Sequence, residues 1–171
     1  MAPLTPACRS LAACPKGPPH CQSLPATARA IVEAYQPLTE QAMRATGSFD
    51  VKLSPQSPAP GIEPANLGRL TIDKQFQGDL EGSSLGEMLS AMGEVQGSAG
   101  YVAIERVTGV LHGKRGSFVL QHHGVMDRGV PTLSVTVVPD SGTEALSGLR
   151  GSFDIQIEQG KHSYVFEYTL P

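Results

Sequence analysis

Eight short segments with the alternating pattern of β-strands lie between Thr46 and Leu170, each closed by a turn that contains glycine. Three of them begin with the triplet Gly-Ser-Phe, at residues 47–49, 116–118 and 151–153. Strands and turns repeated at this spacing, with almost no helical periodicity, are typical of antiparallel barrels and sandwiches. We therefore predict an all-β fold, in which each triplet begins a strand and places its phenylalanine in the core. The predicted strands span residues 46–53, 68–76, 78–92, 98–111, 115–127, 132–138, 151–158 and 161–170.

The use of proline, cysteine and glycine changes near residue 43. Residues 1–42 hold all 3 cysteines and half of the 14 prolines, whereas the rest of the chain holds 18 of the 19 glycines. We expect residues 1–42 to be a disordered, Pro-rich N-terminal extension and residues 43–171 to form the β-barrel domain. Residues 26–36 have the apolar spacing of a short helix that ends before Pro37. Because Met43 directly precedes the first strand, we expect the natural protein to begin there.

The cysteines of the extension, Cys8, Cys14 and Cys21, allow three interpretations. Gaps of five and six residues do not match a zinc knuckle, and only His20 is close to them. The segment from Leu11 to Cys14 resembles a lipidation signal, but no apolar segment of about 7–15 residues precedes it. We favour the third interpretation, incidental thiols in a disordered segment.

Charge and composition exclude several classes of function. The net charge is −3, and no basic face interleaved with aromatic residues is present, which argues against nucleic acid as a partner. No run of about 18 apolar residues predicts a membrane-spanning helix. The predicted barrel contains no cysteine, as expected of a protein in a reducing cytoplasm. His122 and His123 would point to opposite faces of a strand, so we expect no metal site, and no motif calls for a cofactor.

The last two predicted strands give the clearest assignment of faces. If Gln159-Gly160 is a two-residue turn, Phe153 lies opposite Phe166, and one face of the hairpin is apolar while the other is polar. That alternation indicates a sheet with one buried face. A curled sheet of eight strands closes naturally into a barrel, which removes both edges. We therefore predict a closed antiparallel eight-stranded barrel, with a sandwich as the alternative.

Two of the predicted strands, 78–92 and 98–111, are longer than the usual strand of about five or six residues. Both contain interior glycines, which often mark a bulge or a bend. We interpret these glycines as the points where long strands coil around a small barrel: Gly82, Gly86, Gly100 and Gly109.

Four segments resemble a known family when they are taken together, residues 72–82, 97–109, 116–122 and 138–143. They are similar to the bacterial "domain of unknown function 3224" family, whose members form a barrel like that of allene oxide cyclase. The resemblance covers about residues 45–171. It implies a small barrel of unassigned activity that self-associates, here as a homodimer, and it implies no catalytic residues.

Glu105 and His122 are the first candidate site residues. With a turn at residues 113–114, Glu105 lies opposite His122, on an inward face that also carries Tyr101 and is otherwise apolar. A carboxylate beside an imidazole can orient a tautomer or move a proton. Alternatively, the two groups satisfy each other as a buried pair. A slip of one residue would instead pair Glu105 with His123.

Lys74 interrupts the apolar face of its predicted strand. Across a turn at residues 77–78 it would pair with Glu81, and the same register would turn Glu87 inward, toward Glu105. A few polar groups in an apolar interior are typical of a ligand pocket. The alternative is that Lys74 and Glu87 extend to the rim of the barrel.

These observations predict a soluble, cytoplasmic barrel that binds a small apolar or amphipathic molecule in its interior. The candidate pocket residues are Tyr101, Glu105, His122, Tyr164, Glu87 and Lys74. One alternative is a cofactor-independent cyclase or isomerase that uses Glu105 and His122 as acid–base groups. Another is a ligand-free oligomerisation module whose own side chains fill the barrel. An interior cavity above about 300 Å³ would argue against this last alternative.

Overall fold

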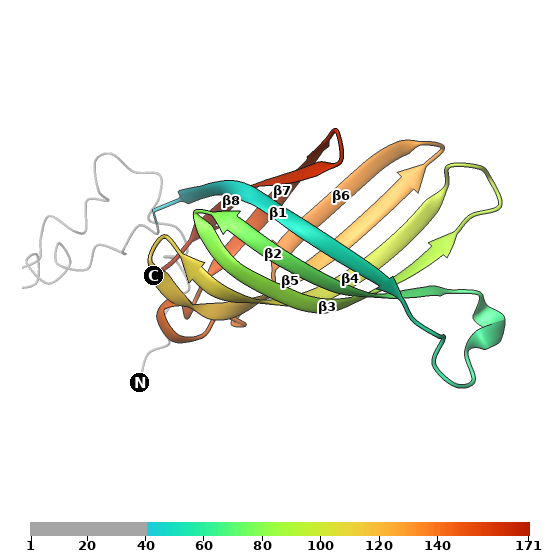
Figure 1. The fold of residues 1–171 in the computed structure, drawn as a ribbon, viewed down its shortest axis with the longest axis horizontal. Helices are drawn as coiled ribbons and strands as arrows, with labels where there is room; N and C mark the ends of the chain where they lie inside the picture. Colours follow the sequence, from blue (N-terminus) through green and yellow to red (C-terminus); the bar gives the residue numbers. More distant parts are fainter. Residues whose placement is uncertain (1–40) are drawn as a thin grey trace, which may run out of the picture. The chain divides into compact units, whose positions relative to one another are not determined.

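The computed structural model describes residues 41–171, which form eight antiparallel strands and two 3-10 helices (Figure 1). The strands are β1 (Met43–Pro55), β2 (Gly68–Gly78), β3 (Leu80–Met92), β4 (Ala99–Leu111), β5 (Lys114–Asp127), β6 (Val130–Val137), β7 (Arg150–Glu158) and β8 (Lys161–Thr169). The helices are η2 (Glu63–Ala65), between β1 and β2, and η3 (Glu144–Leu146), between β6 and β7. All eight predicted strands are present, with ends shifted by at most three residues.

The strands close into a barrel. Each pairs with its neighbours in the sequence, and β1 also pairs antiparallel with β8, where Gly47 lies opposite Tyr164. The predicted closed eight-stranded barrel is therefore confirmed, and the alternative of a sandwich is wrong. The pairing is shortest between β6 and β7, which are joined only by the pairs Val135–Phe153 and Thr136–Ser152.

One end of the barrel, called here the packed end, is filled by side chains. It carries the β2–β3 and β4–β5 turns and η3 (Figure 1). Phe166 stacks on Phe153 at 4.1 Å between ring centroids and on Phe118 at 5.8 Å. Leu146 of η3 is also fully buried in this core. Phe49, Phe118 and Phe153 are all buried, as predicted for the Gly-Ser-Phe triplets, although β1 begins at Met43, four residues before its triplet.

The interior glycines of β3 and β4 allow the two strands to approach closely. Gly82 and Gly109 lie opposite each other. A Cβ added to Gly109 would lie 2.2 Å from the carbonyl oxygen of Glu81, closer than any real contact. A Cβ on Gly100 would meet only one atom, at 3.9 Å. The close approach therefore requires glycine at position 109 and not at position 100.

Three sequence predictions concern other features of the chain. The predicted helix at residues 26–36 and the cysteines Cys8, Cys14 and Cys21 lie outside the described residues. Within residues 41–171, no helix is long and apolar enough to cross a membrane.

Candidate functional site

The other end of the barrel, called here the open end, contains a cavity of about 440 Å³. The loops β1–β2, β3–β4 and β5–β6 and the β7–β8 turn surround this end. Towards this end β6 and β7 are not paired with each other, and both strands line the cavity there, β6 with Leu133 and β7 with Ile155. Its walls are mainly apolar, and they include Phe49, Val51, Ile72, Met88, Leu133 and Ile155.

A buried polar cluster lies where this cavity meets the packed core. The Lys74 ammonium donates a hydrogen bond of 2.7 Å to Glu105 Oε1, and His122 Nε2 lies 2.8 Å from the same oxygen. The Ser84 hydroxyl donates to Glu105 Oε2 at 2.7 Å. All four residues are buried, and Glu105 is fully inaccessible to solvent. Four successive strands, β2 to β5, therefore contribute one side chain each to a single carboxylate-centred cluster.

The strand register explains how Glu105 meets His122. The β4–β5 turn lies at residues 112–113, because Leu111 pairs with Lys114. His122 therefore lies opposite Ala103 and not Glu105, so the predicted register is wrong by two residues. A shift by two keeps every side chain on the same face. The predicted contact between Glu105 and His122 is consequently present, as a diagonal contact rather than a directly opposed pair.

The register predicted for β2 and β3 is wrong by three residues, which reverses the faces of β3. Lys74 lies opposite Ser84 instead of Glu81. The two strands are joined by a longer connection than a two-residue turn, since Phe76 pairs with Gly82. An odd shift moves the inward side chains of β3 to the outside.

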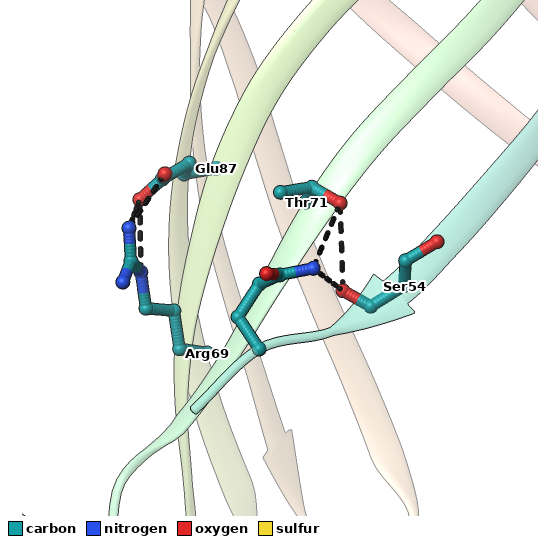
Figure 2. Close-up of polar contacts among 5 residues, drawn as sticks. Ser54, Arg69, Thr71 and Glu87 are labelled. Carbon is teal, nitrogen blue, oxygen red and sulfur yellow. Dashed lines mark hydrogen bonds and ion pairs between the residues drawn. The ribbon is translucent and has the colours of Figure 1, made fainter. Parts of the chain in front are cut away.

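Glu87 therefore points outward, contrary to the prediction. Its carboxylate accepts hydrogen bonds from Arg69 on the outer surface of the barrel, the shortest at 2.7 Å (Figure 2). In the same view, the Thr71 hydroxyl donates a long hydrogen bond to the carbonyl oxygen of Ser54. Glu87 is not part of the cavity.

The two tyrosines predicted for the pocket have different positions. Tyr101 lines the cavity, and burial raises the pKa of its hydroxyl. Tyr164 instead belongs to the core of the packed end, where its hydroxyl accepts a hydrogen bond from the amide of Leu80 at 3.0 Å and donates to the carbonyl of Gln77 at 3.4 Å. Tyr164 is absent from the cavity lining, so it is not a pocket residue.

The sequence interpretation missed Ser84, although its chemistry is central to the cluster. The positions that alternate inward with it along β3 are Gly86, Met88 and Ser90, whereas the large residues Leu85 and Leu89 are exposed. The signal available in the sequence was the small residue at three of these four alternating positions, Ser84, Gly86 and Ser90.

Glu105 is held as a carboxylate. Burial by itself raises the pKa of Glu105, but the hydrogen bond from His122 and the charge and hydrogen bond of Lys74 oppose it, with a further hydrogen bond from Ser84. Their combined effect lowers the pKa to about 2. An ionised carboxylate can only accept hydrogen bonds, so His122 Nε2 carries the hydrogen and donates a hydrogen bond to Glu105 Oε1.

The second ring nitrogen of His122, Nδ1, is not used in the polar cluster and is open to the cavity. His122 lines the cavity, and its hydrogen bond to Glu105 uses Nε2 alone. Among the described residues, no buried side-chain nitrogen or oxygen lacks a partner. His122 Nδ1, which makes no hydrogen bond in this part of the chain, is therefore accessible from the cavity. Glu105 orients the imidazole, and Nδ1 is the ring nitrogen that is open to the cavity.

Lys74 also faces the cavity. Its ammonium lies 4.8 Å from the centre of the Phe49 ring, within the range of a cation–π contact.

In residues 41–171, no group of three or more His, Cys, Asp or Glu side chains has the arrangement of a metal site.

A closed antiparallel barrel of eight strands, with a carboxylate-centred polar cluster beneath an apolar cavity, defines the class of this protein. Residues 45–168 match the family model described as "protein of unknown function (DUF3224)", and the chain belongs to this family. It is similar to a crystal structure of a protein with unknown function from the DUF3224 family of Shewanella oneidensis MR-1. The two are 53% identical, with a TM-score of 0.70, over 77% of this chain and 99% of the other. No curated protein matches the sequence.

Proposed function

We propose that the barrel binds a small apolar or amphipathic molecule in the cavity at its open end. The observation that supports this most strongly is an unfilled cavity of about 440 Å³ with apolar walls and a few convergent polar groups. Ligand pockets have typical volumes of about 300–1,000 Å³ and this mixture of lining groups. A barrel that served only as an oligomerisation module would not need to keep this volume free of its own side chains.

The test uses a variant that fills the cavity. Ala103 is buried, lines the cavity and lies opposite His122. Val102, its neighbour on β4, is 52% exposed on the outer surface and serves as the matched control. We expect the environment-sensitive dye 1-anilinonaphthalene-8-sulfonate to fluoresce with the unaltered chain and with Val102→Leu, and much more weakly with Ala103→Leu. Equal fluorescence of all three proteins would contradict binding in the cavity.

Native mass spectrometry of the purified protein is the second test. A bound molecule carried through purification adds a defined mass to the folded protein, and that mass should be absent from Ala103→Leu. Thermal unfolding of each variant shows whether its fold is intact, so that lost binding is not confused with lost structure.

A second candidate function is a cofactor-independent cyclase or isomerase. The supporting observation is the hydrogen bond between Glu105 and His122, which fixes the imidazole tautomer. In such an enzyme His122 would exchange a proton with the substrate, and Glu105 would act through His122, because a carboxyl of pKa about 2 is a weak base. Once a ligand is known, His122→Gln should abolish turnover and retain binding if the protein is an enzyme.

A further inference from the structure

We propose that the preferred ligand is an amphipathic anion, an alkyl monocarboxylate whose head group meets Lys74 and His122. This inference rests on the proposed binding function and adds the chemical class of the ligand. The ionisable side chains that line the cavity are Lys74, Tyr101, His122 and His162, and among the described residues no carboxylate lines it. Glu105 is fully inaccessible, so a ligand meets the cationic side of the cluster and not its anion.

The cluster keeps hydrogen-bonding capacity for such a head group. An ammonium group has three N–H donors, and Lys74 uses one of them on Glu105. His122 Nδ1 donates when the ring is protonated and accepts when the ring is neutral. One carboxylate oxygen can therefore accept a hydrogen bond from Lys74, while the second oxygen accepts one from Nδ1–H of the protonated His122 ring. The Lys74 ammonium makes a charge-assisted hydrogen bond to either head group, but only a carboxylate adds the attraction between opposite charges, which favours it over an alcohol.

The rest of the cavity suits an alkyl chain. Ile72, Met88 and Leu133 belong to its apolar walls. Each methylene group moved from water into such surroundings adds about 0.8 kcal/mol, which corresponds to roughly a fourfold gain in affinity. Hexanoate, octanoate and decanoate differ by two methylene groups at each step, so affinity should rise roughly fifteenfold per step, about 1.6 kcal/mol, until the cavity is full.

Isothermal titration calorimetry with three ligands of equal chain length tests the head-group preference. The probes are octanoate, 1-octanol and octyltrimethylammonium, all titrated into the full chain. We expect octanoate to bind at least about tenfold more tightly than 1-octanol, and the cation to bind most weakly. Equal affinities for octanoate and 1-octanol would overturn the anionic preference and leave the proposed binding function intact. If none of the three binds at millimolar concentration, both proposals fail.

A charge-neutralising pair of substitutions identifies the residues responsible. Lys74→Met with Glu105→Gln removes the buried ion pair as a unit, so that neither charge is left alone in the core. We expect this double variant to bind octanoate about as weakly as 1-octanol, with 1-octanol affinity unchanged. A retained preference for octanoate would overturn the assignment to Lys74.

The outer ion pair provides the matched control. Arg69→Met with Glu87→Gln makes the same change of charge on the outside of the barrel (Figure 2). The affinity of this control for octanoate should equal that of the unaltered chain, and an equal loss in both double variants would overturn the proposal. If the inner double variant does not fold, the three-ligand comparison on the unaltered chain decides the question alone.

Discussion

Lys74 Nζ lies 2.7 Å from Glu105 Oε1, although the whole of β3 separates the strands that carry them. The contact passes over Ser84, which lies opposite Lys74 and also donates to Glu105. In a closed barrel, inward side chains of strands that are not neighbours converge on the axis. The cluster therefore depends on closure of the sheet, and its stability reports on the fold as well as on the site.

Removing one partner of the buried pair should be much more destabilising than removing both. Lys74→Met leaves the fully buried Glu105 carboxylate without its cation, and we expect a loss of about 3 kcal/mol in the free energy of unfolding. Lys74→Met with Glu105→Gln should lose clearly less, because no buried charge is stranded. Urea unfolding of the three proteins measures the difference. A single variant as stable as the double one would contradict the described pairing.

Stability should fall in acid as Glu105 becomes protonated. The pKa of this carboxyl is lowered from 4.5 to about 2 in the folded protein. A lowered pKa stabilises the folded state above the unfolded pKa, and the stabilisation is lost as the pH falls from about 4.5 to about 2. The shift corresponds to about 3 kcal/mol. Unfolding free energies measured across this range should show a weaker dependence on pH in Glu105→Gln, whereas identical curves would refute a depressed pKa.

Glycine at position 109 should be necessary where glycine at position 100 is not. A Cβ on Gly109 would collide with the backbone of β3, and we expect Gly109→Ala to cost about 1–3 kcal/mol, as other overpacked sites do. Gly100→Ala, on the same strand, adds only one ordinary van der Waals contact, at 3.9 Å, and should leave the stability nearly unchanged. Thermal unfolding compares the two variants. Similar melting temperatures would mean that β3 and β4 do not approach as closely as described.

The hydroxyl of Tyr164 should stabilise the packed end. Tyr164→Phe leaves the amide of Leu80 without its acceptor, and an unsatisfied buried donor costs about 1–3 kcal/mol. Tyr101 is the control, because its hydroxyl makes no hydrogen bond in the described part of the chain and Tyr101→Phe removes none. Equal stability of the two variants, measured by urea unfolding, would argue against the role assigned to Tyr164.

Much of the barrel is predictable because its strands alternate and its turns carry glycine. The β7–β8 hairpin shows why a register can be predicted: Gln159-Gly160 is a two-residue turn, and Phe153 lies opposite Phe166 as expected. A two-residue turn determines which residues face each other, because it leaves the strands no freedom to slide. The contact between Glu105 and His122 was predicted correctly despite the wrong β4–β5 register, because a shift of two residues leaves both side chains on the inner face.

The faces of β3 could not be predicted by the same logic. Its inward positions include the small residues Ser84 and Ser90, and its outward positions include Leu85, which is 67% exposed. Where a sheet lines an open cavity, its inner face does not need large side chains, so the usual rule of apolar residues inside fails. Met88 and Ser90 line the cavity from this strand. The reversal of β3 is thus a consequence of the cavity itself.

The predicted homodimer and the cytoplasmic location remain predictions. Sedimentation velocity of the purified protein checks the first: a single species of twice the monomer mass is expected, and a monomer at all concentrations would contradict it. The division of the chain at residue 43 also remains a prediction, and loss of folding on deletion of residues 1–42 would count against it.

The most direct test of the account is a nitrogen-15 NMR spectrum of histidine-labelled protein with and without octanoate. His122 lines the cavity, while His123, the next residue on β5, is exposed on the outer surface. The signal of His122 Nδ1, assigned by its absence in His122→Gln, should shift as octanoate is added, and the signals of His123 should stay unchanged. An unmoved His122 signal at saturating octanoate would contradict an anionic ligand whose head group meets His122 in the cavity.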